Sequence, residues 1–244
     1  MLTKKEKVVI VHGASVVRDE MAEKLGRKMQ TITSPSGITS VFTNEKAIEV
    51  MLMVYAGLVN KQIVATLLAQ GVKAVGLSGV DGKLWQARWK KDLYVKEGSK
   101  VKLLRNSLTG RVEKVNKELL MLLLKKSYTP VLCPPALSWE NKIVNTDNDW
   151  AAAVVAGTLK IRKMVVLFEA PGFLREVSVE TSLIPKIKRE ELSEFMQYAA
   201  GRMKKKVLGA KKALEMGVEE IYFGDGRIEN PVTRALGGKG TVIK

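Results

Sequence analysis

The sequence predicts an α/β protein with an open, mostly parallel sheet in a three-layer sandwich and a basic β-hairpin excursion. The first observation is a β-branched run at 7–12 that leads through a small-residue turn into an amphipathic segment at 17–25. The second is a helical pattern at 43–68 that leads into another apolar run at 71–77. The third is the set of short alternating segments after Lys83, which are typical of hairpin strands.

The composition limits the domain organisation and the class of partner, but it does not identify one function. Its 244 residues are 46% hydrophobic, which is enough for one long domain or two moderate ones. The 41 Lys and Arg against 25 Asp and Glu give a formal net charge of +16. A positive field of this size attracts an anionic partner, which can be a nucleic acid, an anionic membrane, a nucleotide or an acidic protein.

The single cysteine, Cys133, excludes an intrachain disulfide and a metal cluster built from cysteines of this chain. It lies in the apolar run 130–135, a buried-strand pattern, so we expect a structural thiol rather than a nucleophile, and no metal site. Residues 1–7 lead into only a short apolar run, and no later window is judged uninterrupted enough to cross a bilayer. These observations predict a soluble, cytoplasmic protein.

The turn at 12–15 follows the first predicted strand and precedes the first predicted helix. Its backbone N–H groups and the helix N-terminus can face an anion. The turn lacks a full Gly-x-Gly-x-x-Gly pattern, so an ordinary tight βα connection is the simpler interpretation. His12 is the only histidine, and beside a buried strand we expect a packed residue rather than a base.

The next elements continue the alternation. After a turn at 34–37 we expect a helix over 43–58 with Thr43 as its N-cap, continued at 60–68. The strand at 71–77 then ends in the glycine-containing loop 78–82.

Four short segments after Lys83 are predicted to form hairpin strands, at 84–87, 92–96, 101–104 and 110–115. Cations outnumber acids on these segments. A solvated hairpin face explains the charge, and so does a docking surface for an acidic partner. The residues we assign to docking are Arg88, Lys90, Lys91, Arg105 and Arg111.

A polar cluster, Asn145-Thr146-Asp147-Asn148-Asp149, follows the predicted helix 117–126 and strand 130–133. It leads directly into the Ala-rich run 150–156, which is typical of a buried helix. One N-cap needs one such residue, whereas four of these five positions are Asn or Asp. The cluster is therefore either a cap with an Asx-turn or part of a site for a polar substrate.

The C-terminal part is predicted to contain a strand at 164–168, a helix at 190–200, a helix at 207–216 and a strand at 218–223. Gly201 and the cations 204–206 stand before the second of these helices. Cations oppose the helix dipole at that end, so a nucleotide phosphate would explain them, with a solvated lysine run as the alternative.

Several of these loops, in order along the chain, resemble the amino-acid kinase family and its N-acetylglutamate kinase branch. The segments are 11–13, 49–61, 76–82, 145–149, 171–172, 201–206 and 240–241. Within the family the chain is most similar to kinases that act on aminoadipate or glutamate attached to the amino-group carrier protein LysW. The segments that indicate this subgroup are 74–82, 94–116, 134–138 and 225–231.

The resemblance implies the transfer of the γ-phosphoryl group of MgATP to a side-chain carboxylate, which gives an acyl phosphate. It also implies a site, with Lys206 neutralising the phosphoryl group, Asp149 orienting the catalytic lysine, and Asn145 binding the substrate. Gly13 and Ala14 would donate backbone N–H groups to the phosphoryl group. Gly201, Met203 and Lys206 would border the nucleotide, and ATP with its Mg²⁺ would be the cofactor.

The chain departs from the family pattern at several of these positions. Relatives begin with a further strand and a Lys-x-Gly-Gly turn, which has no counterpart in these residues. Their arginine for the substrate α-carboxylate aligns with Val41, so Val41 lines the substrate site without a bidentate contact. Phe168 and Glu169 replace a small polar residue and Asp or Asn, and Trp150 is bulkier than expected.

The resemblance implies a division into a substrate, carrier-binding and dimerisation half at 1–160 and a nucleotide-binding half at 161–244. A LysW-like small acidic carrier and a homodimer are the expected partners. The alternative is a catalytically impaired paralogue, or a truncated chain, that keeps the fold and binds the carrier. Nucleic-acid binding rests on charge alone, because no recognition helix or aromatic ladder accompanies the cations.

Overall fold

The computed structural model describes residues 6–199 and 201–244, which form two compact units, Met1–Ala151 and Ala152–Lys244. The boundary falls inside helix α5 (Asn148–Thr158), earlier than the expected division at 160. The assignment of substrate and nucleotide to the two halves stays a prediction. The α/β fold class is confirmed, with most strand pairs of the two main sheets parallel.

The first unit is built on one six-stranded sheet. Its strands are β1 (Ile10–Val11), β4 (Ala74–Gly79), β5 (Trp85–Lys90), β8 (Thr109–Val115), β9 (Thr129–Ser138) and β10 (Ile143–Thr146). Strand β9 pairs in parallel with β1, β4 and β5 and antiparallel with β10. It is buried along nearly its whole length, which explains its continuous apolar sequence.

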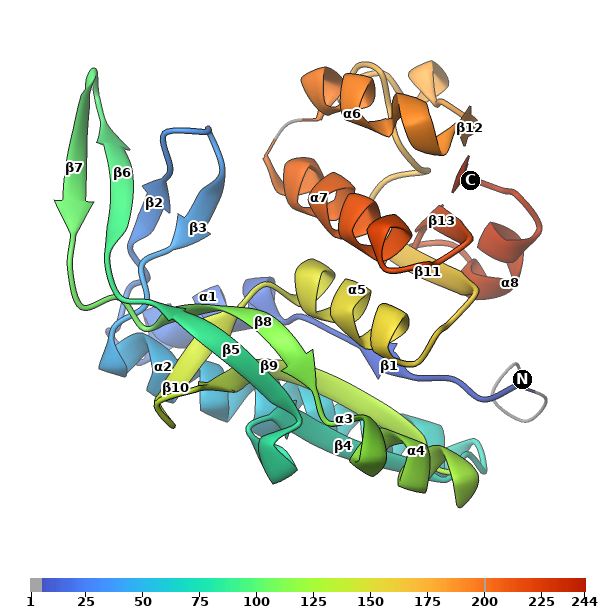
Figure 1. Cartoon of the computed structure of the whole chain (residues 1–244), viewed down its shortest axis with the longest axis horizontal. Coiled ribbons are helices and arrows are strands. Elements are labelled where there is room, and N and C mark those ends of the chain that lie inside the picture. Colours follow the sequence, from blue (N-terminus) through green and yellow to red (C-terminus); the bar gives the residue numbers. More distant parts are fainter. Residues whose placement is uncertain (1–5, 200) are drawn as a thin grey trace. The chain divides into compact units, whose positions relative to one another are not determined.

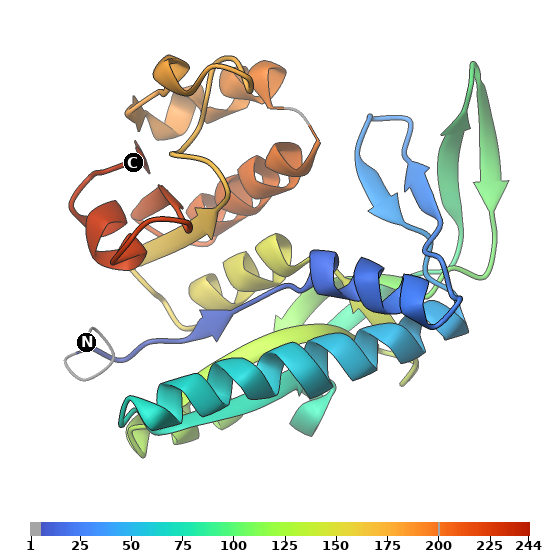
Figure 2. The same cartoon turned by 180° about the vertical axis from the view of Figure 1, so that it is seen from behind.

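One long helix lies along this sheet, against β4 and β9 (Figure 2). It consists of α2 (Glu45–Met51), a π-helical segment (Leu52–Val59) and α3 (Asn60–Ala69). The expected cap is wrong by one residue, because the side chain of Asn44, not Thr43, accepts the N–H of Ala47. Helices α1 (Ser15–Lys24) and α4 (Lys117–Lys125) complete the unit together with a 3-10 turn, Asp81–Lys83.

The continuous helix Glu45–Ala69 is long and apolar enough, by length and composition alone, to cross a membrane. The expectation that no window of this kind exists is therefore wrong. The reason is that two predicted segments join without a break through the π-helical segment. Core helices of soluble proteins pass the same test, so the helix does not by itself indicate a membrane protein.

Two antiparallel hairpins project side by side from the first unit (Figures 1 and 2). One is β2 (Thr31–Thr33) with β3 (Thr39–Val41), and the other is β6 (Leu93–Glu97) with β7 (Lys100–Leu104). The four strands predicted after Lys83 are confirmed as β5, β6, β7 and β8. Of the β2–β3 hairpin the sequence predicts only the turn at 34–37, because three-residue strands carry little periodic signal.

The second unit has a four-stranded sheet in the order β11 (Lys163–Phe168), β13 (Glu220–Asp225), β14 (Thr241–Ile243) and β12 (Lys186–Ile187). Its helices are α7 (Arg202–Glu215), α8 (Pro231–Leu236) and the short α6 (Leu192–Phe195), with a further 3-10 turn at Glu180–Ser182. Their core is apolar and centred on side chains such as Phe173, Ile221 and Phe223.

Two predicted helices of this unit differ in the structure. The helix expected at 190–200 is only α6, between the 3-10 turns Arg189–Glu191 and Met196–Tyr198. Residue 200 lies outside the described residues. Helix α7 begins at Arg202 rather than at Val207, so the cations 204–206 belong to the helix itself.

A close approach between α3 and β4 fixes the long helix on the sheet. The side chain of Asn60 is fully buried and lies over Gly76, where an added Cβ would meet the Asn60 Oδ1 atom at 1.8 Å. Only glycine permits this approach, because real Cβ contacts are never that short.

We predict that Gly76→Ala destabilises the fold by roughly 3 kcal/mol, since either Asn60 or the backbone of β4 must move. The control is Gly57→Ala, in the long helix that packs on β4, where an added Cβ would meet the Leu52 carbonyl oxygen at an ordinary contact distance of 3.6 Å. That change should be neutral or stabilising by up to about 1 kcal/mol. Urea unfolding measures both, and equal effects of the two substitutions would contradict the packing argument.

Candidate functional site

The polar cluster and the first turn of the first unit come together in the structure. Gly13 and Ala14 follow β1, and α1 begins at Ser15 without a side-chain cap. The amide of Asn148, the first residue of α5, lies against this turn, with Oδ1 at 3.1 Å from the position of a Gly13 Cβ. Two helix N-termini therefore open beside one glycine, which gives backbone N–H groups suited to an anion.

Asn145 and Val41 are also neighbours in this region. The Asn145 amide donates to the Thr43 hydroxyl at 3.1 Å, and that hydroxyl donates to the Val41 carbonyl at 3.2 Å. Thr43 is fully buried and holds Asn145 in one orientation. The side chain of Val41 packs on the apolar cluster around α1 and the long helix, so it adds no polar contact. Thr43 was expected only as a cap, and no sequence signal indicated this second role.

Asp147 is the residue of the cluster 145–149 that caps helix α5. Its carboxylate accepts the backbone N–H of Trp150 at 2.9 Å, which is the geometry of an N-cap. The capping function therefore belongs to Asp147, and Asn145, Asn148 and Asp149 are not needed for it. Asp149 lies in the first turn of α5, and it also interacts with another group of the protein.

Trp150 faces the basic strands. Its indole N–H donates to the Val112 carbonyl at 3.0 Å, and the Arg111 guanidinium stacks on its ring at 4.2 Å from the centroid. This cation–π contact fixes Arg111 beside the C-terminal end of the polar cluster 145–149.

A hydrogen-bonded chain orients His12 just before the glycine turn. Asn60 donates one amide N–H to the Val131 carbonyl at 3.0 Å and the other to His12 Nε2 at 3.1 Å. The Asn60 oxygen accepts from Lys61 at 3.2 Å, which assigns the amide orientation. His12 Nε2 is then an acceptor, and Nδ1–H donates to the Gly13 carbonyl at 3.3 Å. Burial lowers the pKa of His12, and the neutral ring fits its role as a packed residue.

The predicted nucleotide residues lie in the second unit. Gly201 is the N-cap of α7 with a φ of 51°, a left-handed conformation that favours glycine. Met203 packs on the apolar core of the unit. The Lys206 ammonium lies 5.6 Å from the centre of the Phe168 ring and has a further interaction.

The residues assigned to docking are spread over β5, β8 and the connections to the β6–β7 hairpin. Lys91 and Arg105 are exposed, and Arg88 pairs with Glu113 at 2.7 Å. Lys90 is only partly exposed. Burial lowers the pKa of Lys90 first, and the positive charges of Arg111 and Arg88 lower it further.

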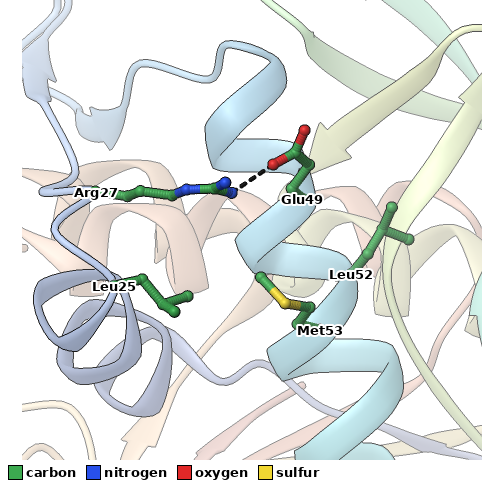
Figure 3. A pocket seen from close by; sticks show the side chains of 5 residues that line it. All are labelled: Leu25, Arg27, Glu49, Leu52 and Met53. Atoms are coloured by element: carbon green, nitrogen blue, oxygen red, sulfur yellow. Dashed lines mark hydrogen bonds and ion pairs between the residues drawn. The ribbon is translucent and has the colours of Figure 1, made fainter.

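Other features of the chain lie apart from these residues. An open pocket of about 530 Å³ lies beside α1 and α2, and Figure 3 shows an Arg27–Glu49 ion pair across it. Its lining contains none of the predicted site residues. Burial raises the pKa of Cys133 to about 12, as expected of a structural thiol. Within residues 6–199 and 201–244, no three His, Cys, Asp or Glu residues cluster as metal ligands do.

Comparison with known proteins places these features in context. The model of the amino acid kinase family matches residues 1–225. The LysW-aminoadipate kinase of Thermus thermophilus is 45% identical over 240 residues, which are 98% of this chain and 89% of that protein. A protein of Nitrosopumilus maritimus named putative LysW-aminoadipate/LysW-glutamate kinase is 36% identical, over 96% of this chain and 87% of that protein.

Solved structures give the same fold at lower identity. The N-acetylglutamate synthase of Neisseria gonorrhoeae superposes with a TM-score of 0.79 at 24% identity, over 99% of this chain and 53% of that chain. The carbamate kinase of Giardia superposes with a TM-score of 0.64 at 14% identity, over 99% of this chain and 85% of that chain.

We predict that the His12 ring is neutral with its proton on Nδ1, because Nε2 accepts from Asn60. Because its pKa is lowered from the ordinary 6.5, the folded state binds fewer protons than the unfolded state. Its contribution to stability is therefore present above pH 6.5 and is lost as the pH falls through the folded-state value. As the only histidine, His12 gives one set of imidazole ¹⁵N signals.

Asn60→Leu should return the ring to the Nε2–H form that free histidine prefers, and the pH dependence should change with it. A proton on Nε2 in the unsubstituted protein would contradict this assignment. Circular dichroism of the Asn60→Leu protein shows whether the fold is retained during the measurement.

Proposed function

The chain belongs to the amino acid kinase family, and we propose that it phosphorylates the side-chain carboxylate of aminoadipate or glutamate carried on a small acidic protein. It is an amino-acid kinase, and its relatives support a step in lysine biosynthesis, with arginine biosynthesis included where glutamate is the substrate. The observation that carries the proposal is the Gly13–Asn148 approach, which puts two helix N-termini at one turn in a chain with these relatives.

ATP is the proposed phosphoryl donor, and the N-terminal turn of α7 is the proposed phosphate site. The turn begins at the left-handed Gly201, whose missing side chain leaves open space beside the helix N-terminus. Lys204, Lys205 and Lys206 are partly buried there, so their charges fit a bound polyphosphate better than free solvent. Lys206 neutralises charge on the transferring group, and Mg²⁺ arrives with the nucleotide and neutralises phosphate charge.

The acceptor is proposed to bind in the first unit. Gly13 and Ala14 donate backbone N–H groups to the phosphoryl group, and Asn145, held by Thr43, binds the amino-acid part of the substrate. Asp149 supplies the carboxylate that orients the catalytic lysine. No covalent intermediate with the protein is needed, because alignment and charge neutralisation are sufficient for phosphoryl transfer.

Arg88, Lys90, Lys91, Arg105 and Arg111 are proposed to dock the carrier. Their strands carry an excess of positive charge, and the whole chain has a net charge of +16. An acidic carrier is steered to such a surface by long-range attraction, which salt screens.

A homodimer is proposed from the outer face of the long helix. Met53, Leu58 and Leu68 are 48%, 38% and 52% exposed, which is unusual for large apolar side chains along one helix. Leu25 and Met53 continue the apolar surface into the pocket of Figure 3. Burial of this face against a second copy would remove it from water.

The alternative is a catalytically impaired protein that binds the carrier. Two observations favour the impaired protein. The Val41 side chain adds no polar contact, and the bulky Trp150 stands directly after the polar cluster 145–149. The two functions differ in one respect only, which is whether an acyl phosphate forms.

We predict that the protein, given MgATP and carrier-bound aminoadipate, forms an acyl phosphate that hydroxylamine traps as a hydroxamate. Lys206→Met should lower kcat by about a hundredfold or more, because charge on the transferring group is no longer neutralised. Lys211→Met, at an exposed lysine of the same helix, is the control and should leave kcat unchanged. No turnover by a folded protein that binds the carrier without ATP would establish the alternative.

We also predict that carrier binding weakens as the salt concentration rises from about 50 mM to about 500 mM, because salt screens the exposed charges of Lys91 and Arg105. Replacing both Lys91 and Arg105 by Gln should weaken binding at low salt and flatten this dependence. Replacing Lys125 and Lys126 by Gln removes the same charge from exposed positions at the end of α4 and serves as the control. Titration calorimetry measures both, and equal losses in the two variants would show a nonspecific charge effect.

A further inference from the structure

Three neighbouring strands of the first unit bring a lysine into line with Asn145. Strand β5 pairs with β8 so that Lys90 lies opposite Thr109, and β8 pairs with β10 so that Thr109 lies beside Asn145. Residues paired in this way point to the same face of a sheet. Lys90 and Asn145 therefore stand on one face, two strands apart.

The same face also carries two arginines. Arg88 and Arg111 lie directly opposite each other on β5 and β8, two residues along from the Lys90–Thr109 pair. Like charges in directly opposite positions destabilise a sheet. Each arginine has its own local contact, Arg88 with Glu113 at 2.7 Å and Arg111 with the Trp150 ring at 4.2 Å.

Lys90 differs from both arginines because it is without such a contact. Within residues 6–199 and 201–244 its ammonium group has no hydrogen bond and no ion pair, although Lys90 is more buried than either arginine. The charged groups that act on it are Arg111 and Arg88, which disfavour its charge, and Asp147, which favours it more weakly. A partly buried ammonium crowded by two cations is stabilised when an anion binds beside it.

The proposed reaction supplies an anion of the right kind. An amino acid joined to a carrier through its amino group keeps two carboxylates, and only the side-chain carboxylate accepts the phosphoryl group. The α-carboxylate needs a cation of its own. Val41, which packs on the apolar cluster, does not supply one.

We propose that Lys90, supported by Arg111, binds the free α-carboxylate of the carrier-linked amino acid beside Asn145. This inference rests on the proposed function and assigns Lys90 to the substrate itself rather than to the surface of the carrier. Lys90 donates to the carboxylate as a point charge, and Arg111, fixed on Trp150, adds a planar donor at the same face.

The test compares two carriers that differ in one group. One is charged with 2-aminoadipate, and the other with 5-aminopentanoate, which has the same chain and terminal carboxylate but no α-carboxylate. The unsubstituted protein should bind the first about tenfold more tightly, a difference that one charge-assisted hydrogen bond supplies. Lys90→Met should lose most of this difference and keep only what Arg111 supplies, and Lys90→Arg should restore part of it. Lys96→Met, on the exposed strand β6, should keep the full difference.

The outcomes separate this inference from the function on which it rests. A preference for the aminoadipate carrier that stays at full size in Lys90→Met overturns the assignment of Lys90 and leaves the kinase proposal intact. Equal weakening of both carriers by Lys90→Met also overturns it, because Lys90 would then contact only the carrier. If the unsubstituted protein binds neither charged carrier, the proposed function fails and the inference fails with it.

Discussion

The buried amide of Asn60 is the constraint on which the arrangement of the first unit depends. It joins the long helix to three strands, through Gly76 of β4, the Val131 carbonyl of β9 and His12 at the end of β1. All of its hydrogen-bonding groups are used, so burial costs it little, whereas loss of one partner leaves a polar group unpaired in the core. The position of the glycine turn after His12 is therefore fixed by the hydrogen bonds of Asn60 in the core of the first unit.

The positive charges of the proposed acceptor site and of the proposed nucleotide site lie on different kinds of element. In the first unit the cations Arg88, Lys90 and Arg111 lie on strands, on the same face of the sheet as the neutral amide of Asn145. In the second unit the cations 204–206 lie in the first turns of helix α7. Both placements cost stability in the isolated chain, through like-charge repulsion on the sheet and through the helix dipole. Anionic ligands would offset both costs, which fits the proposed nucleotide and the proposed acidic carrier.

The sequence was sufficient for the fold class, because the apolar run of β9 reports burial directly. It was also sufficient to place the four strands after Lys83. It failed where the signal is tertiary. The short helix α6 packs on the core of the second unit, and Met203, in the first turn of α7, packs on the same core. The roles of Thr43 and Asn148 depend on partners that are distant in sequence, so no local pattern could have indicated them.

The π-helical segment Leu52–Val59 has a consequence for the lengths that this part of the chain can have. A π turn accommodates more residues than an α turn, so the segment acts as a phase adjustment between α2 and α3. Deleting one residue there would restore regular α-helix and turn everything after it by about 100° around the helix axis. Asn60 would then face away from Gly76 and lose its buried hydrogen bonds. The number of residues in the segment is therefore fixed by the packing of Asn60.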